Sequence, residues 1–448
     1  MSTSLTIRNG RVIDPSQGLD EVTDLTLEHG RVARIGRVAA PAGDVLDASG
    51  CIVSPGLIDP QVHFREPGQE EKETIATGAA AAVAGGFTSV VCMANTAPPI
   101  DDDARVEFVY RQAARANLCN VFPTGAVTKG RKGDELAEIG LMAKAGAVAF
   151  TDDGDAIPSA AVMAKALSYV KMTGRALMQH CEDPSLVQGG VMNAGATAVR
   201  LGLAGRPAVA EELIIHRDIT LNRAIGCRYH VQHLSTEGGV DLIRHARKQG
   251  QPVTTEVAAH HLLLTEANCV GYDTNYKMNP PLRTQRDIDA LLEGVKDGTI
   301  TMLATDHAPH TAEEKDLEFA LAPAGILGLD CTLPLYVQAL IDSGVIDWPR
   351  LIEMMTLRPA ELCGLEGRGT LKPGGFADVT VIDPQMQWTI DKRQFASKAR
   401  NCPFHGWNVT GRAIATIVAG DIKLCLDPER YKGVDRAIPT QASQLVPA

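Results

Sequence analysis

The middle of the chain repeats one pattern eight times, a short apolar run followed by a longer stretch with helical spacing. Alternating strands and helices of this kind predict a parallel sheet, and eight such units predict a TIM-type (β/α)8 barrel. An open doubly wound sheet is the alternative, but it usually carries a glycine-rich phosphate loop after its first strand, and the first run here has none. The eight runs are 56–64, 88–95, 120–127, 147–153, 176–180, 228–233, 252–260 and 301–306.

The two ends of the chain differ from this middle and resemble each other. Residues 1–55 and residues 368–448 contain short β-type runs with turn signals between them. We therefore expect both ends to pair into one small discontinuous β domain, which leaves 56–367 for the barrel. Within the first run of the barrel, Pro60 is expected to end the strand because proline cannot donate to a sheet ladder.

One uncharged stretch, residues 75–100, is long enough to span a bilayer. It is rich in Ala, Gly and Thr, and Gly85 and Gly86 divide it into a helix-like half and a strand-like half. This pattern predicts a helix, a turn and a strand of the barrel, and excludes a membrane span.

Composition narrows the partners and the compartment. Lys and Arg number 43 against 54 for Asp and Glu, a formal charge of -11, which argues against a nucleic-acid-binding protein. The ten cysteines are scattered singly, without the dense spacing of a small secreted scaffold. The start of the chain shows no signal-peptide pattern. These features predict a cytoplasmic protein.

Polar side chains end nearly every apolar run, and in a TIM-type barrel the carboxyl ends of the strands meet at one mouth. Because side chains alternate along a strand, only one of His230 and His233, and one of Asp152 and Asp153, can face that mouth. Imidazole nitrogens with carboxylate oxygens suit zinc, and an open coordination position makes a zinc site hydrolytic. The run-ending residues are His63, Asn95, Asp153, His180, His233, His260 and Asp306.

The motifs GLIDPQVHFREPG, CMANTAPPID, FTDDG, HCED, HVQHLST, KMNPPLRT and TDHAPH occur in the order of the amidohydrolase superfamily. Over essentially the whole chain, they resemble the bacterial type I dihydroorotases. This resemblance implies reversible, zinc-dependent hydrolysis of the cyclic amide of dihydroorotate to N-carbamoyl-aspartate, in pyrimidine biosynthesis.

The resemblance also implies functions for individual residues. Asp306 matches a metal ligand that also acts as the catalytic base and acid. The other implied metal ligands are His63, Asp153, His180 and His233, and the implied substrate contacts are Arg65, Asn95, Asn279, His310, Ala324 and Gly325. Arg65 is also expected on chemical grounds, because a guanidinium binds a carboxylate through two parallel hydrogen bonds.

Several of these residues have an ordinary structural alternative. Taken singly, each histidine is more typical of a partly buried core side chain than of a metal ligand. Asp306 could cap a helix, and Asn95 and Asn279 precede prolines in sequences that also form turns. Arg65 could pair with Glu66 instead of binding substrate.

Gln61 departs from the family pattern, because the family usually has a histidine there and a glutamine is a poorer zinc ligand. Three outcomes are open: a weakened two-metal site, a single zinc held mainly by Asp153, His180 and His233, or lost catalysis. We favour retained activity, because the other implied ligands, Arg65 and His310 are all present.

Two further hypotheses stay open. Hydantoinases and allantoinases usually carry a lysine where FTDDG stands and lack the arginine of REPG, so the sequence favours them less. A catalytically silent subunit that scaffolds aspartate transcarbamoylase is supported by Gln61 alone. The partners considered are the small-molecule substrate, further copies of the chain in a homo-oligomer, and aspartate transcarbamoylase; nucleic acid and membrane are excluded.

Overall fold

A computed structural model describes residues 4–41, 43–433 and 438–445. Each of the eight predicted runs overlaps one strand. The strands are β6 (Leu57–Val62), β7 (Phe87–Cys92), β8 (Asn120–Pro123), β9 (Ala149–Phe150), β10 (Ala176–Gln179), β13 (Arg228–Val231), β14 (Val253–Ala258) and β15 (Met302–Ala304).

These strands form a closed parallel barrel. β6, β7 and β8 pair in one parallel group, and β9, β10, β13, β14 and β15 pair in another. Parallel bridges between Gly125 and Phe150 and between Val62 and His307 join the two groups at both seams. The predicted (β/α)8 barrel is therefore confirmed, and the carboxyl ends of all eight strands meet at one mouth.

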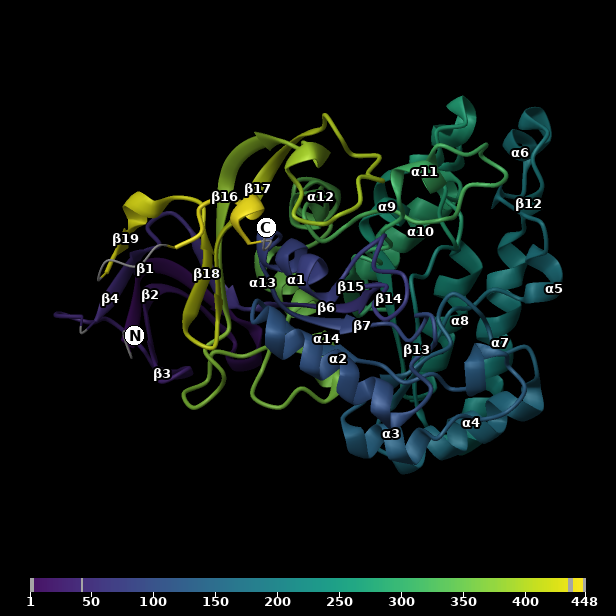
Figure 1. Ribbon diagram of the computed structural model, residues 1–448, viewed down its shortest axis with the longest axis horizontal. Helices are drawn as coiled ribbons and strands as arrows, with labels where there is room; N and C mark the ends of the chain where they lie inside the picture. Colours follow the sequence, from purple (N-terminus) through teal and green to yellow (C-terminus); the bar gives the residue numbers. More distant parts are fainter. Residues whose placement is uncertain (1–3, 42, 434–437, 446–448) are drawn as a thin grey trace.

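Helices surround the barrel and fill the connections between its strands (Figure 1). After β8 the α-helix begins only at Ile139, because the residues before it include a bridge between Thr128 and Leu136. The helices are α1 (Ile75–Ala84), α2 (Asp103–Ala116), α3 (Ile139–Ala145), α4 (Ala160–Met172), α5 (Pro184–Val187), α6 (Ala196–Leu201), α7 (Ala208–Ile225), α8 (Glu237–Lys248), α9 (Ala259–Leu263), α10 (Gln285–Lys296), α11 (Ala312–Lys315), α12 (Thr332–Tyr336), α13 (Trp348–Met355) and α14 (Leu357–Cys363).

Both ends of the chain build a second sheet beside the barrel, where purple and yellow strands lie together in Figure 1. Antiparallel pairing of β16 with β5, for example Thr380 with Ser54, joins the two ends directly. The expected small β domain from both ends is thus confirmed, and the limits 1–55 and 368–448 remain our proposal. Its strands are β1 (Ser4–Asp14), β2 (Leu19–Glu28), β3 (Arg31–Ile35), β4 (Asp44–Asp47), β5 (Ile52–Pro55), β16 (Val379–Thr389), β17 (Asn408–Val418), β18 (Asp421–Cys425) and β19 (Tyr431–Lys432).

Pro60 does not end the first barrel strand, so that prediction is wrong. β6 continues through Pro60 to Val62, and its register against β7 shifts between Asp59 and Val62. A register shift leaves room for a residue that has no N–H to donate to the ladder. His63 therefore follows directly after the strand.

The uncharged stretch folds as its glycines predict. α1 ends at Ala84 and β7 begins at Phe87, and Gly86 in the turn has φ +95, a conformation that favours glycine. A Cβ at Gly86 would lie 2.6 Å from the Cβ of Ala413 on β17, so this turn packs directly against the second sheet. Of the helices in the described ranges, none is long and apolar enough to cross a membrane.

Gly86→Ala is expected to lower the free energy of unfolding by about 1–3 kcal/mol, because the new methyl group meets both backbone strain and a packed neighbour. Thermal unfolding of the variant measures this loss. The matched control is Gly140→Ala in α3, where a Cβ meets nothing within 4 Å and alanine favours the helix. Equal melting temperatures for the two variants would contradict the packing described here.

Candidate functional site

A cavity of about 160 Å³ lies at the carboxyl ends of the barrel strands. It gathers every run-ending residue except His260, and every residue implied by the family resemblance except Gly325. The lining residues are His63, Arg65, Asn95, Asp153, Gly154, His180, His233, Met278, Asn279, Asp306, Ala308, His310 and Ala324.

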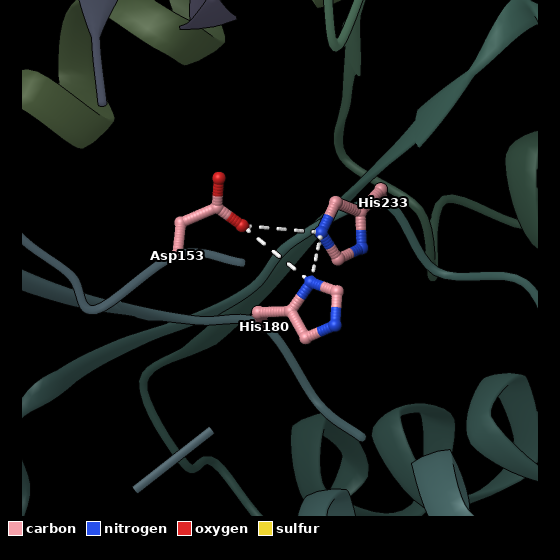
Figure 2. A group of neighbouring side chains, drawn as sticks. All are labelled: Asp153, His180 and His233. Atoms are coloured by element: carbon pink, nitrogen blue, oxygen red, sulfur yellow. Dashed lines mark hydrogen bonds and ion pairs between the residues drawn. The ribbon is translucent and has the colours of Figure 1, made fainter. Parts of the chain in front are cut away.

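Three of these side chains form a tight buried group, shown in Figure 2. The Nδ1 atom of His180 lies 2.9 Å from Nε2 of His233, and Oδ1 of Asp153 lies 3.5 Å and 3.4 Å from these two atoms. The residues come from three strands, since Asp153 follows β9, His180 follows β10 and His233 follows β13. All three are buried, with at most 4% of their surface exposed.

Electrostatic interactions within this group favour a negative charge on Asp153 and a positive charge on His180. Burial alone lowers the pKa of His180, but its bonds to Asp153 and Glu182 outweigh burial and raise that pKa to about 10. Burial raises the pKa of Asp153, yet the hydrogen bonds of His180 and His233 hold it well below its usual range. The group therefore stabilises a positive charge between one carboxylate and two imidazoles.

The donor set fits a divalent metal. Two imidazole nitrogens and one carboxylate oxygen, all within 4.8 Å of one another, are ligands that zinc accepts. The facing nitrogens of His180 and His233 can share a hydrogen bond only if one of them carries a proton, whereas a cation would bind both lone pairs. The second nitrogen of His180 contacts Glu182 at 3.1 Å, the outer-shell carboxylate that metal-binding histidines usually have.

His63 extends this group toward Asp306. Its Nδ1 atom lies 2.9 Å from Oδ1 of Asn95, while Nε2 lies 3.0 Å from Oδ1 of Asp306 and 3.3 Å from Oδ2 of Asp153. Both ring nitrogens thus face oxygen acceptors, and a neutral imidazole can donate to only one of them. A cation bound beside Nε2 would leave Nδ1 to donate to Asn95.

Gln61 occupies the remaining corner. Its Nε2 atom is 3.4 Å from Oδ1 of Asp306, and its buried Oε1 atom has no hydrogen-bond partner among the described residues. The amide therefore contacts the Asp306 carboxylate from the position where the family usually has a histidine.

Backbone conformation is unusual at three site residues. His233, Asp306 and Arg65 have φ of +31, +48 and +62, where non-glycine residues are uncommon. Such conformations persist when the surrounding structure enforces them, and they concentrate at functional sites. Asp306 caps no helix, because the next helix, α11, is capped by Thr311; the capping alternative is therefore wrong.

Arg65 does not pair with Glu66. The Glu66 carboxylate instead accepts hydrogen bonds from the backbone N–H of Ile75 at 2.8 Å and from Gln112 at 2.6 Å. Arg65 donates to the carbonyl of Pro309 at 3.2 Å, and no described carboxylate lies within 4.0 Å of its guanidinium. Burial lowers the pKa of Arg65 to about 10, so it stays a cation at neutral pH.

His310 and the chain segment opposite complete this side of the cavity. Burial, followed by the charges of Arg65 and Lys72, lowers the pKa of His310 to about 3, so its ring is neutral. Its Nε2 atom lies 2.9 Å from the carbonyl oxygen of Ala324. Gly325 follows Ala324 in the chain, and a Cβ there would lie 2.6 Å from the carbonyl oxygen of Ala308.

The two asparagines expected to contact substrate also have protein partners. Asn95 accepts from His63, which orients that ring. Asn279 lines the cavity, and in the amide orientation that satisfies both of its ends, its oxygen accepts from Arg206 at 3.2 Å. Arg206 also donates to Glu182 at 2.6 Å. The sequence signal for Glu182 was its place two residues after His180 in HCED, whereas nothing in the sequence marks Arg206.

Two buried lysines that sequence analysis missed hold the segment that carries Ala324 and Gly325. Lys315 donates to the carbonyls of Pro323 at 3.0 Å and Gly325 at 3.3 Å. Lys277 donates to the carbonyl of Phe319 at 2.7 Å. Lys315 stands in a polar stretch, so its sequence context indicates an exposed side chain, yet it is 8% exposed.

Known proteins match this chain over most of its length. Residues 50–238 match the family described as Dihydro-orotase-like. The dihydroorotase of Pelobacter propionicus is 49% identical over 421 residues, which cover 94% of this chain and 99% of that relative. The chain belongs to the dihydroorotase family. A second member, from Pelotomaculum thermopropionicum, is 49% identical over 419 residues, 93% of this chain and 98% of the relative.

Solved structures support the same architecture. An L-hydantoinase (dihydropyrimidinase) from Arthrobacter aurescens aligns with a TM-score of 0.85 and 26% identity, covering 99% of this chain and 98% of the other. A D-hydantoinase from Thermus sp. gives a TM-score of 0.79 and 27% identity, with 94% and 95% covered. The resemblance drawn from the motifs is confirmed, and the chain is a hydrolase that acts on cyclic amides.

Lys315→Met is expected to change how stability depends on pH. Burial, followed by the charge of Lys277, lowers the pKa of Lys315 from 10.5 to about 7. Between these values the unfolded chain holds a proton that the folded chain lacks, so stability rises with pH by at most about 1.4 kcal/mol per pH unit. Urea unfolding at pH 7 and pH 9 should show this rise in the parent protein and a smaller one in the variant.

The control for that measurement is Lys372→Met, because Lys372 is exposed. Its pH dependence should follow the parent protein. Parallel curves for the parent and Lys315→Met would mean that Lys315 titrates as in water, which would contradict the burial of its amine against the 319–325 segment.

Proposed function

We propose that the enzyme is a zinc-dependent dihydroorotase, which hydrolyses the cyclic amide of dihydroorotate reversibly to N-carbamoyl-aspartate in pyrimidine biosynthesis. The observation that carries this proposal is the buried group of Asp153, His180 and His233 beside Asp306 and Arg65 in one cavity. The identity of about one residue in two with proteins named dihydroorotase supports the substrate.

In this proposal Asp306 is the general base and acid. It accepts a proton from the attacking water as the C–O bond forms at the ring carbonyl, and returns a proton to the ring nitrogen as the C–N bond breaks. One water is consumed: one of its protons goes to the ring nitrogen, and the other leaves the new carboxyl group for solvent, so the product carries one more negative charge than the substrate. His63, 3.0 Å away, orients the Asp306 carboxylate.

Arg65 is proposed to bind the substrate carboxylate. Its charge has no protein carboxylate within 4.0 Å among the described residues, so it is available to an anionic ligand. Asn95, Asn279, His310 and the backbone of Ala324 and Gly325 are proposed to hold the rest of the ring. Neutral His310 can do so without repelling Arg65.

We further propose that Asp153, His180 and His233 hold one zinc ion, with His63 and Asp306 nearby. Bound zinc would lower the pKa of a water ligand to about 7 and polarise the carbonyl of the substrate. Gln61 weakens the second metal position, because a neutral amide stands where an imidazole would bind.

The remaining proposals concern the cellular compartment and the protein partners of the enzyme. A cytoplasmic location is supported by the ten cysteines, all of them unpaired and buried. A homo-oligomer and a complex with aspartate transcarbamoylase follow from the resemblance to the family. The hypothesis of a silent scaffold is disfavoured, because a scaffold has no need of Asp306, Arg65 and His310 in one cavity.

Asp306→Ala is expected to reduce kcat for dihydroorotate by about 10²–10⁴-fold, because the general base is lost. Zinc content should stay at that of the parent, since three ligands remain. A hydrolysis assay on zinc-loaded protein, with hydantoin as competing substrate, measures this effect.

The control is Asp155→Ala, an exposed carboxylate that pairs with Arg131 outside the cavity. Turnover of hydantoin but not of dihydroorotate would overturn the proposed substrate.

Gln61→His is expected to raise the zinc content from one ion per chain toward two. An imidazole there supplies a second nitrogen beside His63, and it removes the amide that binds Asp306. Elemental analysis of the dialysed proteins gives the stoichiometry. The matched control is Gln179→His on β10, also fully buried. Zinc content that is identical in parent and Gln61→His would contradict the weakened second position.

A further inference from the structure

A second, larger cavity of about 750 Å³ opens on the opposite face of the barrel. The starts of β13, β14 and β15 line it at Arg228, Val253 and Met302, together with α13 and α14. His233 and Asp306 of the active site follow the other ends of β13 and β15. This cavity therefore lies apart from the site described above, and it is here called the basal cavity.

The basal cavity is strongly basic in an acidic protein. Five cationic side chains line it, against two carboxylates, although the whole chain carries a formal charge of -11. The cations are Arg228, Arg247, Lys296, Arg350 and Arg358, and the carboxylates are Asp297 and Glu361. Charges of one sign that gather in a cleft focus its potential and attract the opposite sign.

Three carboxylates near the cavity form ion pairs with arginines. Asp297 lies 2.7 Å from Arg244, and Glu361 lies 2.9 Å from Arg358. Glu353 lies 2.7 Å from Arg350 and also contacts Arg358.

Arg228, Arg247 and Lys296 have no carboxylate within 4.0 Å among the described residues. Two of these cations are held in place by neutral groups. Arg247 donates to the carbonyl of Val253 at 3.1 Å. Arg228 donates to the carbonyl of Leu362 at 3.0 Å and also contacts those of Gly174 and Glu361.

Burial, then the charges of Arg358 and Arg350, lowers the pKa of Arg247. Fixed guanidinium groups that repel one another around an open space are preorganised for an anion, because binding it relieves the repulsion.

We propose that the basal cavity binds a small molecule that carries a phosphate group. A phosphate brings up to two negative charges and three acceptor oxygens, which match forked guanidinium donors better than a single carboxylate does. The volume lies within the range of about 300–1,000 Å³ typical of small-molecule sites, so a nucleotide fits as well as free phosphate.

Isothermal titration of the zinc-loaded enzyme with inorganic phosphate, AMP and adenosine tests this proposal. We expect saturable binding of phosphate or AMP with a Kd below about 1 mM, no binding of adenosine, and weaker binding in 0.5 M NaCl. AMP that binds tighter than phosphate identifies a nucleotide site, and equal affinities identify a site for phosphate alone. Binding of adenosine as tight as that of AMP, or no saturable binding of phosphate and AMP, would overturn the proposal.

Variants assign the binding to this cavity. Arg247→Gln with Lys296→Gln should weaken binding at least about tenfold, since charged hydrogen bonds to the anion are lost. Lys296→Gln alone, at an exposed position, should weaken it in the same direction without a risk to folding. Arg393→Gln, an equal charge change at a side chain 78% exposed elsewhere, and Arg65→Gln in the active site should leave affinity unchanged. Binding lost in Arg65→Gln but kept in the double variant would overturn the assignment.

Discussion

The structure depends on one constraint: imidazoles and carboxylates from separate strands are buried together at the strand ends, where their charges and hydrogen bonds must be satisfied. The facing nitrogens of His180 and His233, 2.9 Å apart, need a proton or a metal cation between them, and Asp153 lies beside both. The barrel fixes this arrangement, because the strands that precede these residues are parallel neighbours. The strained backbone at His233 and Asp306 indicates that the surrounding fold holds both side chains in place against their local preference.

Much of this arrangement could be predicted from the sequence, for physical reasons. The parallel strands are short and apolar, and helices separate them, so the sequence pattern predicts each strand. In a TIM-type barrel the carboxyl ends of these strands meet at one mouth. Alternation along the strands allowed only one residue of each pair, Asp152 or Asp153 and His230 or His233, to face the mouth, and the family resemblance implied Asp153 and His233. The structure agrees, since Asp152 binds the backbone N–H of Val127 and His230 contacts Glu256 inside the barrel.

What the sequence did not predict depends on contacts between distant segments. Arg206 reaches Glu182 from 24 residues away, and Lys277 reaches Phe319 from 42. Neither contact has a local signal, because a charged side chain in a loop usually lies in water. Pro60 was misjudged for a related reason, since a register shift that accommodates proline depends on the neighbouring strand.

Zinc-edge anomalous diffraction from crystals of the zinc-loaded protein tests the central claim most directly. The account predicts a peak about 2.0–2.2 Å from Oδ1 of Asp153, Nδ1 of His180 and Nε2 of His233. A strong zinc peak elsewhere, with none among these three atoms, would contradict it.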